Sequence, residues 1–458
     1  MKISKRQLIF LGIIIFVTLI FIMAHLSYKK IIKVVEVDNI YENIFVNEIN
    51  IGGLKKSDAQ KKIYSELQAP IDKKIIKFTD TNNEYEFSFK DFHAAYNITS
   101  AVQKAYDYAR DGSILKRYEK IVALKKSPLK ITAEYGFDNN FVKSKLSELE
   151  SKVYVKPINA SAKRINNNFV VTAGKNGRTL NVDATLPAVI KLLQEKCEGK
   201  VELIFDLLVP KYNESVFKNV KDVLGSYTTY FNNVNLQRNA NIINAAQKIN
   251  NKVVYPNEIF STNDVLKPFT AKNGYKNAPV IIEGKLVDAL GGGICQVSTA
   301  LYNALLYSEL EITERRNHSL KVGYVDYGYD ATLAGNYIDL KFKNTTQTPL
   351  LLESIINENE NANSLRINVY GAETRNKNHS IKFENSLVET IDAPPETIIY
   401  TDELEEGTKK VETKSKKGYR YKLYKIIYEN GAEKQKVLIN SSYYKPMRGT
   451  IKIGTKKS

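Results

Sequence analysis

The chain has 458 residues, a formal net charge of +17, 43% hydrophobic residues and 26% charged residues. This composition is typical of a globular protein and excludes a disordered chain, and at about 150 residues per domain the length allows three or four domains. The strong positive charge predicts a polyanionic neighbour, such as nucleic acid, anionic lipid or a cell-wall polyanion.

A nearly unbroken apolar run at residues 8–24 follows Lys2, Lys5 and Arg6. Its length is near the lower limit for crossing a hydrocarbon core of about 30 Å. A cleaved signal peptide is the alternative, but no Ala-x-Ala site follows the run. We therefore expect residues 1–28 to be a cytoplasmic tail and a single-pass anchor in the cell membrane, with the bulk of the chain extracellular. The basic surface then faces cell-wall polyanions or an anionic lipid surface, and nucleic acid is excluded as a partner.

A basic stalk at residues 29–44 leads into an α+β pattern at residues 45–210. Helical patterns occur at residues 101–109, 141–149 and 184–197, and strand patterns at residues 75–89, 121–133, 169–172 and 201–209. The order and size predict one α+β module of roughly 170 residues.

A second α+β unit is predicted at residues 227–372, and a small all-β module at residues 383–458. In the second unit a helical period covers residues 239–249, a helix runs from Cys295 to about residue 308, and alternation at 338–342 and 365–369 predicts antiparallel strands. The last segment has recurrent glycines between β-rich pieces and no helical pattern.

Three glycines, Gly291, Gly292 and Gly293, bring Cys295 to the predicted first turn of a helix. Glycine lets a substrate come close, and the helix start favours a thiolate, which is a recurrent way to present a nucleophile. A buried structural cysteine is the alternative reading. Cys197 is interpreted as a second free thiol, although a disulfide between the two cysteines stays open.

His318 is the histidine that fits this chemistry, because it precedes an alternating segment, residues 319–324, that predicts a strand. His93 and His379 are predicted to be surface residues. Cysteine at a helix start and histidine on a following strand is the layout of papain-like thiol enzymes, in which the imidazole takes the thiol proton.

A carboxylate is expected to orient His318, and Asp330 and Asp326 are the candidates. The alternative for Asp330 is a turn cap. Arg315 and Arg316 could bind a substrate carboxylate in a bidentate manner, or could be a solvated pair. The glycines are not a phosphate loop, no cluster has zinc spacing and no carboxylate pair suggests a glycosidase, so no metal and no cofactor are expected.

A longer set of motifs resembles the VanW domain over residues 227–355. The motifs are Arg238-Asn239, residues 256–261, Gly274-Tyr275, residues 278–281, 291–299, 301–304 and 314–319, and Asp330-Ala331-Thr332. Asn257 departs from the glycine that is common there, but asparagine suits such a turn. Residues 45–210 are similar to the peptidoglycan-binding domain that commonly precedes VanW, and the C-terminal segment is similar to a five-glycine module of cell-wall proteins.

The resemblance implies a role, because some VanW proteins of this architecture are L,D-transpeptidases that form 3→3 peptidoglycan crosslinks. It implies that Cys295 is the nucleophile and that peptidoglycan stem peptides are the partner. In this reaction His318 is expected to be the general base and acid, with Asp330 or Asp326 as the orienting group. The N–H groups of residues 294–296 are expected to stabilise an oxyanion. Substrate contacts are expected from Gly292, Gly293, Gln296, Ser298, Arg315 and Arg316. A wall-binding protein without activity and a thiol peptidase are the alternatives.

Overall fold

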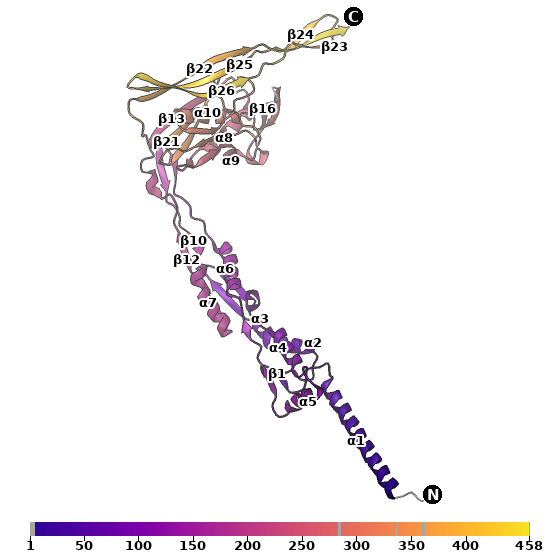
Figure 1. Ribbon diagram of the computed structural model, residues 1–458. Coiled ribbons are helices and arrows are strands. Elements are labelled where there is room, and N and C mark those ends of the chain that lie inside the picture. Colours follow the sequence, from indigo (N-terminus) through magenta and orange to yellow (C-terminus); the bar gives the residue numbers. More distant parts are fainter. Residues whose placement is uncertain (1–4, 283–284, 336, 360–361, 458) are drawn as a thin grey trace. The chain divides into compact units, whose positions relative to one another are not determined.

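The computed structural model describes residues 5–282, 285–335, 337–359 and 362–457, and it divides into two compact units (Figure 1). The first unit is Met1–Pro157 with Asn176–Val209, and the second is Ile158–Lys175 with Pro210–Ser458. The mixture of helices and strands confirms the predicted α+β class. The hairpin within Ile158–Lys175 belongs to the second unit, although it lies inside the module predicted at residues 45–210.

The first unit is built from short helices and small sheets. Its helices are α1 (Lys5–Val35), α2 (Lys56–Ile63), the π-helix η1 (Tyr64–Gln68), α3 (Ala69–Asp72), the 3₁₀-helix η2 (Phe89–Phe92), α4 (Ile98–Asp107), α5 (Ile114–Ala123), α6 (Asn139–Val153) and α7 (Val182–Glu195). Its strands are β1 (Ile44–Val46), β2 (Ile49–Asn50), β3 (Ile75–Thr79), β4 (Glu84–Ser88), β5 (Ala95–Tyr96), β6 (Leu129–Ile131), β7 (Tyr135–Gly136), β10 (Gly177–Leu180), β11 (Gly199–Glu202) and β12 (Phe205–Leu208).

Two hydrophobic cores hold the first unit together. In one, the apolar face of α4, with Ala101, Val102 and Ala105 buried, packs against α2 and β1. In the other, α6 and α7 cover the sheet β11-β3-β4. Ile76 and Phe78, at alternate positions of β3, are fully buried in the core between the sheet and these helices.

The single strand predicted at residues 201–209 is wrong. The chain leaves its parallel pairing with β3 after β11 and pairs antiparallel with β10 as β12. An apolar run cannot reveal that its two halves belong to different sheets.

The second unit contains most of the strands. Its strands are β8 (Ser161–Ile165), β9 (Asn168–Thr172), β13 (Asp222–Phe231), β14 (Lys252–Val254), β15 (Ile259–Ser261), β16 (Asn277–Ile282), β17 (Lys285–Leu290), β18 (Glu311–Glu314), β19 (Lys341–Lys343), β20 (Leu350–Asn357), β21 (Asn363–Gly371), β22 (His379–Ile391), β23 (Thr397–Glu405), β24 (Lys409–Thr413), β25 (Gly418–Glu429), β26 (Ala432–Tyr444) and β27 (Thr450–Lys456). Its helices are η3 (Glu214–Phe217), α8 (Leu236–Ile249), α9 (Thr262–Leu266), η4 (Ala271–Asn273) and α10 (Ile294–Tyr307).

The main core of the second unit lies between α10, α8 and the antiparallel sheet β13-β21-β20-β14 (Figure 1). Nearly every residue of α10 is buried, including Val297, Leu301 and Leu305. A helix that is apolar around most of its circumference is a core helix. The site at its start is therefore attached to the buried core of the unit.

The C-terminal part, from β22 onward, is all-β, as predicted. It has two three-stranded sheets, β22-β25-β26 and β23-β27-β24. Leu423 of β25 is fully buried in the main core of the second unit. The β22-β25-β26 sheet is therefore packed on that core.

The N-terminal helix α1 is long and apolar enough to cross a membrane, and its apolar window is not buried against the protein. Helices of this kind serve as membrane anchors or as signal sequences.

Candidate active site

Cys295 lies in the first turn of α10, directly after the three glycines. Gly291 and Gly293 have φ angles of 85° and 107°, in the left-handed region that other residues rarely adopt. A Cβ on Gly292 would lie 2.4 Å from the carbonyl oxygen of Ala278, so no side chain fits at this position. The glycines therefore make the tight approach that starts the helix and leaves Cys295 half-buried at the edge of the core.

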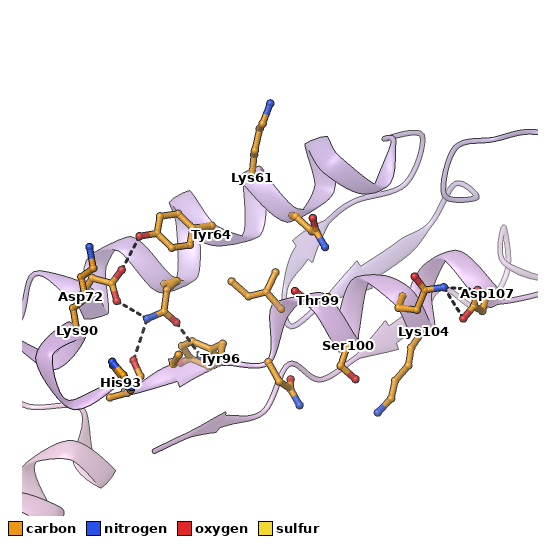
Figure 2. Close-up of a pocket in the computed structure, with 17 residues that line it drawn as sticks. Lys61, Tyr64, Asp72, Lys90, His93, Tyr96, Thr99, Ser100, Lys104 and Asp107 are labelled. Atoms are coloured by element: carbon orange, nitrogen blue, oxygen red, sulfur yellow. Dashed lines mark hydrogen bonds between the residues drawn. The ribbon is translucent and has the colours of Figure 1, made fainter. Parts of the chain in front are cut away.

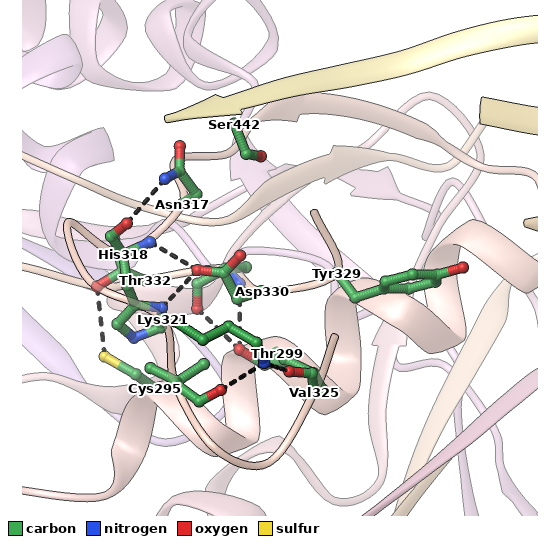
Figure 3. Close-up of polar contacts among 12 residues, drawn as sticks. Cys295, Thr299, Asn317, His318, Lys321, Val325, Tyr329, Asp330, Thr332 and Ser442 are labelled. Carbon is green, nitrogen blue, oxygen red and sulfur yellow. Dashed lines mark hydrogen bonds and ion pairs between the residues drawn. The ribbon is translucent and has the colours of Figure 1, made fainter. Parts of the chain in front are cut away.

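His318 and Asp330 form a buried pair next to the cysteine (Figure 3). Nδ1 of His318 lies 2.7 Å from Oδ2 of Asp330, and the same oxygen accepts the backbone N–H of His318 at 2.6 Å. A carboxylate bonded to Nδ1 fixes the ring and leaves Nε2 for the thiol. Of the two candidate carboxylates, Asp330 is the one that contacts His318, whereas Asp326 is exposed.

Two further side chains, Tyr444 and Arg315, hold Asp330 through three hydrogen bonds. Its Oδ1 accepts the Tyr444 hydroxyl at 2.6 Å and Nη2 of Arg315 at 3.3 Å. Nε of Arg315 also donates to the Asp330 carbonyl at 2.8 Å. The carboxylate is only 1% exposed, and these charge-assisted bonds compensate for its burial.

The electrostatics of the site favour a thiolate–imidazolium pair. Burial opposes a charged imidazole, but the hydrogen bonds and charges of Asp330 and Cys295 outweigh burial and raise the pKa of His318 to about 9. Burial also opposes the thiolate, but the hydrogen bond and charge of His318 hold the pKa of Cys295 below its ordinary value. Burial likewise opposes the Asp330 carboxylate, whose pKa is nevertheless lowered by His318 and Arg315.

Two of the three N–H groups expected to stabilise an oxyanion already have partners. The N–H groups of Ile294 and Gln296 donate to the carbonyls of Gly291 and Gly293 at 3.2 and 3.0 Å, so both are already used in the turn. Beside the sulfur, the N–H of Leu333 lies 3.4 Å from Sγ of Cys295. Oγ1 of Thr332 lies 3.6 Å from the same sulfur (Figure 3).

Most of the side chains expected to contact substrate have partners within the fold. Gln296 is buried, accepts from Arg238 at 2.7 Å and donates to the Tyr230 carbonyl at 2.9 Å. Ser298 is buried and donates to the Ala331 carbonyl at 2.7 Å.

The remaining expected contacts divide between buried and accessible positions. The Arg315 side chain is 7% exposed and makes four hydrogen bonds within the fold, so its guanidinium is not available to a substrate carboxylate. Gly292 is enclosed by the Ala278 backbone. Arg316 is exposed and Gly293 is partly exposed, and they are the predicted contact residues that a substrate can reach.

Two further expectations about histidines are wrong. Residues 319–324 are not a strand, because they run through bends and a turn, so His318 lies on an irregular loop. His379 is not a free surface residue, because it lies 2.7 Å from both Glu309 and Glu429. His93 is exposed and stacks on Phe141, as a surface residue can.

Several residues that complete the site could not be recognised from local sequence patterns. Tyr324 packs edge-on to the His318 ring, with 6.4 Å between ring centroids, and burial raises its pKa well above the ordinary value. Tyr444 is 114 positions from Asp330, so no local pattern could connect the two. Thr332 is part of the motif Asp330-Ala331-Thr332, but nothing in that motif indicated a contact with Cys295.

Both cysteines are free thiols, and Cys197 is exposed. Among the described residues no group of histidine, cysteine, aspartate and glutamate side chains could hold a metal ion.

A separate groove of about 1350 Å³ lies in the first unit, between the α2–η1 helix and α4 (Figure 2). Its lining includes Lys61, Tyr64, Gln68, Asp72, Tyr96 and Lys104. Tyr64 donates to Asp72 at 2.7 Å, and Gln68 donates to the same carboxylate at 2.6 Å and accepts from the Tyr96 N–H at 2.9 Å. The groove thus combines aromatic rings with a fixed polar network.

Comparison with known proteins finds three matching family models. The model described as VanW like protein matches residues 237–370, a model for a candidate peptidoglycan binding domain matches residues 85–202, and the G5 domain matches residues 384–456.

Two curated relatives are similar to the chain. The uncharacterized protein YoaR of Bacillus subtilis (strain 168) is 36% identical over 210 residues, which are 46% of this chain and 68% of that protein. The vancomycin B-type resistance protein VanW of Enterococcus faecalis (strain ATCC 700802 / V583) is 33% identical over 107 residues, which are 22% of this chain and 39% of that protein.

Two solved G5 structures match the C-terminal part. The G5 domain of IgA1 protease has 25% identity and a TM-score of 0.13, covering 18% of this chain and 99% of its own. The structure of HP0197-G5 has 17% identity and a TM-score of 0.12, covering 17% of this chain and 97% of its own.

Proposed function

The chain belongs to the VanW family and carries modules of the peptidoglycan-binding and G5 types, and from this premise we propose that it is a cysteine-dependent L,D-transpeptidase. It would form 3→3 crosslinks between peptidoglycan stem peptides. The observation that carries the proposal is a half-buried thiol at the start of α10, beside an imidazole that the buried Asp330 carboxylate holds in place.

In the first step, the Cys295 thiolate attacks the carbonyl carbon of the third residue of a donor tetrapeptide. A C–S bond forms, and the negative charge that develops on the oxygen falls near the Leu333 N–H and the Thr332 hydroxyl. The C–N bond to the terminal D-Ala then breaks. His318, which holds the proton taken from the thiol, gives it to the leaving amine. A thioester and free D-Ala result.

In the second step, the side-chain amine of another stem attacks the thioester carbonyl. His318 takes a proton from this amine, the C–S bond breaks, and the Cys295 thiolate is restored. The new amide joins the third residues of two stems. If water replaces the amine, the same site is a thiol peptidase, so the two activities differ only in the acceptor.

The test uses the full-length protein in detergent with purified disaccharide-tetrapeptides, and mass spectrometry identifies the products. We expect crosslinked dimers, released D-Ala and a transient acyl adduct on Cys295. Cys295→Ala should abolish all three, whereas Cys197→Ala, the matched control at an exposed thiol, should leave them unchanged. Tripeptides without dimers would identify a peptidase, and unchanged muropeptides would identify a wall-binding protein without activity.

We also propose that the groove of the first unit holds a glycan strand of the wall. The support is the exposed ring of Tyr64, which is oriented by Asp72 and can pack on a sugar face. Tyr64→Ala should weaken co-sedimentation of the full-length protein with isolated sacculi. Tyr154→Ala removes an equally exposed tyrosine outside the groove and serves as the control. Equal sedimentation of both variants would contradict this placement.

A further inference from the structure

The strand β26 of the C-terminal module runs beside the loop that carries His318. Nδ2 of Asn317 donates to the Tyr443 carbonyl at 2.8 Å, and the N–H of Lys445 donates to the Ser319 carbonyl at 2.8 Å. These bonds lie on either side of His318. Residues 315–333, which are all described, contain no helix or strand, so the loop is ordered by such contacts and not by a sheet of its own.

Tyr444, the last residue of β26, reaches the centre of the site. It is 2% exposed, its hydroxyl donates to Oδ1 of Asp330 at 2.6 Å, and the same hydroxyl accepts the Gly328 N–H at 2.7 Å. With Oδ1 held in this way, the carboxylate cannot rotate, and its Oδ2 stays directed at His318.

A second contact from the same strand supports Arg315. Nη1 of Arg315 donates to Oγ of Ser442 at 2.9 Å, and Ser442 in turn donates to Asn440 at 2.9 Å. Asn440 also donates to the hydroxyl of Tyr302, a residue of α10, at 2.9 Å. Alternate residues of β26 thus contact the core helix, the arginine and the carboxylate, as expected for one face of a strand.

We propose that the C-terminal module completes the reaction site, with Tyr444 as a positioning residue that orients Asp330 and, through it, His318. The proposal rests on the proposed function, because it takes Cys295 and His318 as the reacting pair. The module is then more than an attachment to the wall. A chain that lacked it would keep the cysteine and the histidine but lose the group that aligns them.

The test compares Tyr444→Phe with Tyr443→Phe in the full-length protein. Tyr443 is the adjacent residue, is 37% exposed and lies on the other face of β26, so its change controls for the loss of a hydroxyl. Iodoacetamide alkylation of Cys295 is measured from pH 5 to pH 10 by peptide mapping, with exposed Cys197 as the internal reference. The other ionisable groups that face the site, Arg238, Arg315, Lys321 and Tyr324, are the same in both variants.

We expect Tyr444→Phe to move the alkylation midpoint of Cys295 up by about one pH unit, which lowers the rate well below the midpoint by about tenfold. Tyr443→Phe should match the wild type. If both variants give the wild-type profile, Tyr444 does not position the site and the proposal is wrong.

Two further measurements separate positioning from misfolding and from the proposed function. Far-ultraviolet circular dichroism, which reports the backbone, should be the same for Tyr444→Phe and Tyr443→Phe. Ser442→Ala should shift the alkylation midpoint in the same direction as Tyr444→Phe. A shift that appears only with a changed spectrum would count against positioning. If the wild type makes no crosslinks but the midpoint still shifts, the proposed function fails and the role of Tyr444 stands.

Discussion

Asp330→Asn is the sharpest perturbation of the site, because one carboxylate contacts His318, Arg315 and Tyr444. The change keeps the size of the side chain and removes its charge. An asparagine that turned its NH₂ group toward Nδ1 of His318 would force the proton onto Nε2. The imidazole could then no longer accept the thiol proton, and Arg315 would lose its buried counter-charge.

The magnitude follows from the pKa of His318, which is raised from 6.5 to about 9 and so corresponds to about 3 kcal/mol in favour of the imidazolium. Burial lowers this pKa, and the hydrogen bond of Asp330 is the largest cause that raises it, so the pKa of His318 should fall in the variant. The wild-type histidine stabilises the fold fully below pH 6.5 and loses this effect as the pH rises through about 9.

Asp330 has the opposite sign, because its pKa is lowered from 3.8, so its stabilisation is present above pH 3.8 and is lost as the pH falls through its folded-state pKa. The free energy of unfolding should therefore differ most between wild type and variant from about pH 4 to pH 6.5.

The assay measures dimer formation, Cys295 alkylation and urea unfolding of the full-length protein. We expect dimer formation to fall by roughly 10³–10⁴, as when a serine triad loses its orienting carboxylate, and alkylation at pH 7 to slow. Asp326→Asn makes the same chemical change on the same loop at an exposed position and should behave like the wild type. If Asp330→Asn reacted as fast as Asp326→Asn at every pH, the reasoning about the pair would be refuted.

Four other outcomes are expected. Gly292→Ala places a Cβ 2.4 Å from the Ala278 carbonyl and should lower the thermal midpoint and slow Cys295 alkylation, whereas Gly323→Ala, in open space, should do neither. His318→Ala should lower dimer formation by roughly 10²–10⁴, the usual loss for a general acid–base, and an unchanged rate would exclude this role. Glu309→Gln removes the carboxylate shared by His379, Lys425 and Arg375 and should destabilise the C-terminal module by up to about 3 kcal/mol. Limited proteolysis measures this loss, and Glu389→Gln, at an exposed ion pair, is the control. Residues 8–24 should be recovered by mass spectrometry from membrane fractions if α1 is an anchor, whereas a soluble protein that begins near Ser27 would show a cleaved signal peptide.

Local patterns were enough to predict the elements that build the site, but not the contacts that complete it. The glycines and the helical period placed Cys295 at the start of α10, because both features depend on neighbouring residues. The loop of His318 could not be predicted, since its order comes from β26, more than a hundred positions away. The same holds for Gln296, Ser298 and Arg315, whose polar side chains suggest substrate contacts until their buried partners are known.

The arrangement of charges bears on whether Cys295 is a structural or a reactive cysteine. Arg315, Asp330, His318 and Cys295 alternate in sign along one chain of contacts at the edge of the core. Burying such groups costs free energy, and apolar residues of similar size would often stabilise a fold as well or better. A structural cysteine needs none of these partners, whereas a nucleophile needs the imidazole, its orienting carboxylate and the arginine that balances the charge. Because apolar residues could fill a purely structural role as well, and because the arrangement supports the thiolate, it favours a thiol that reacts.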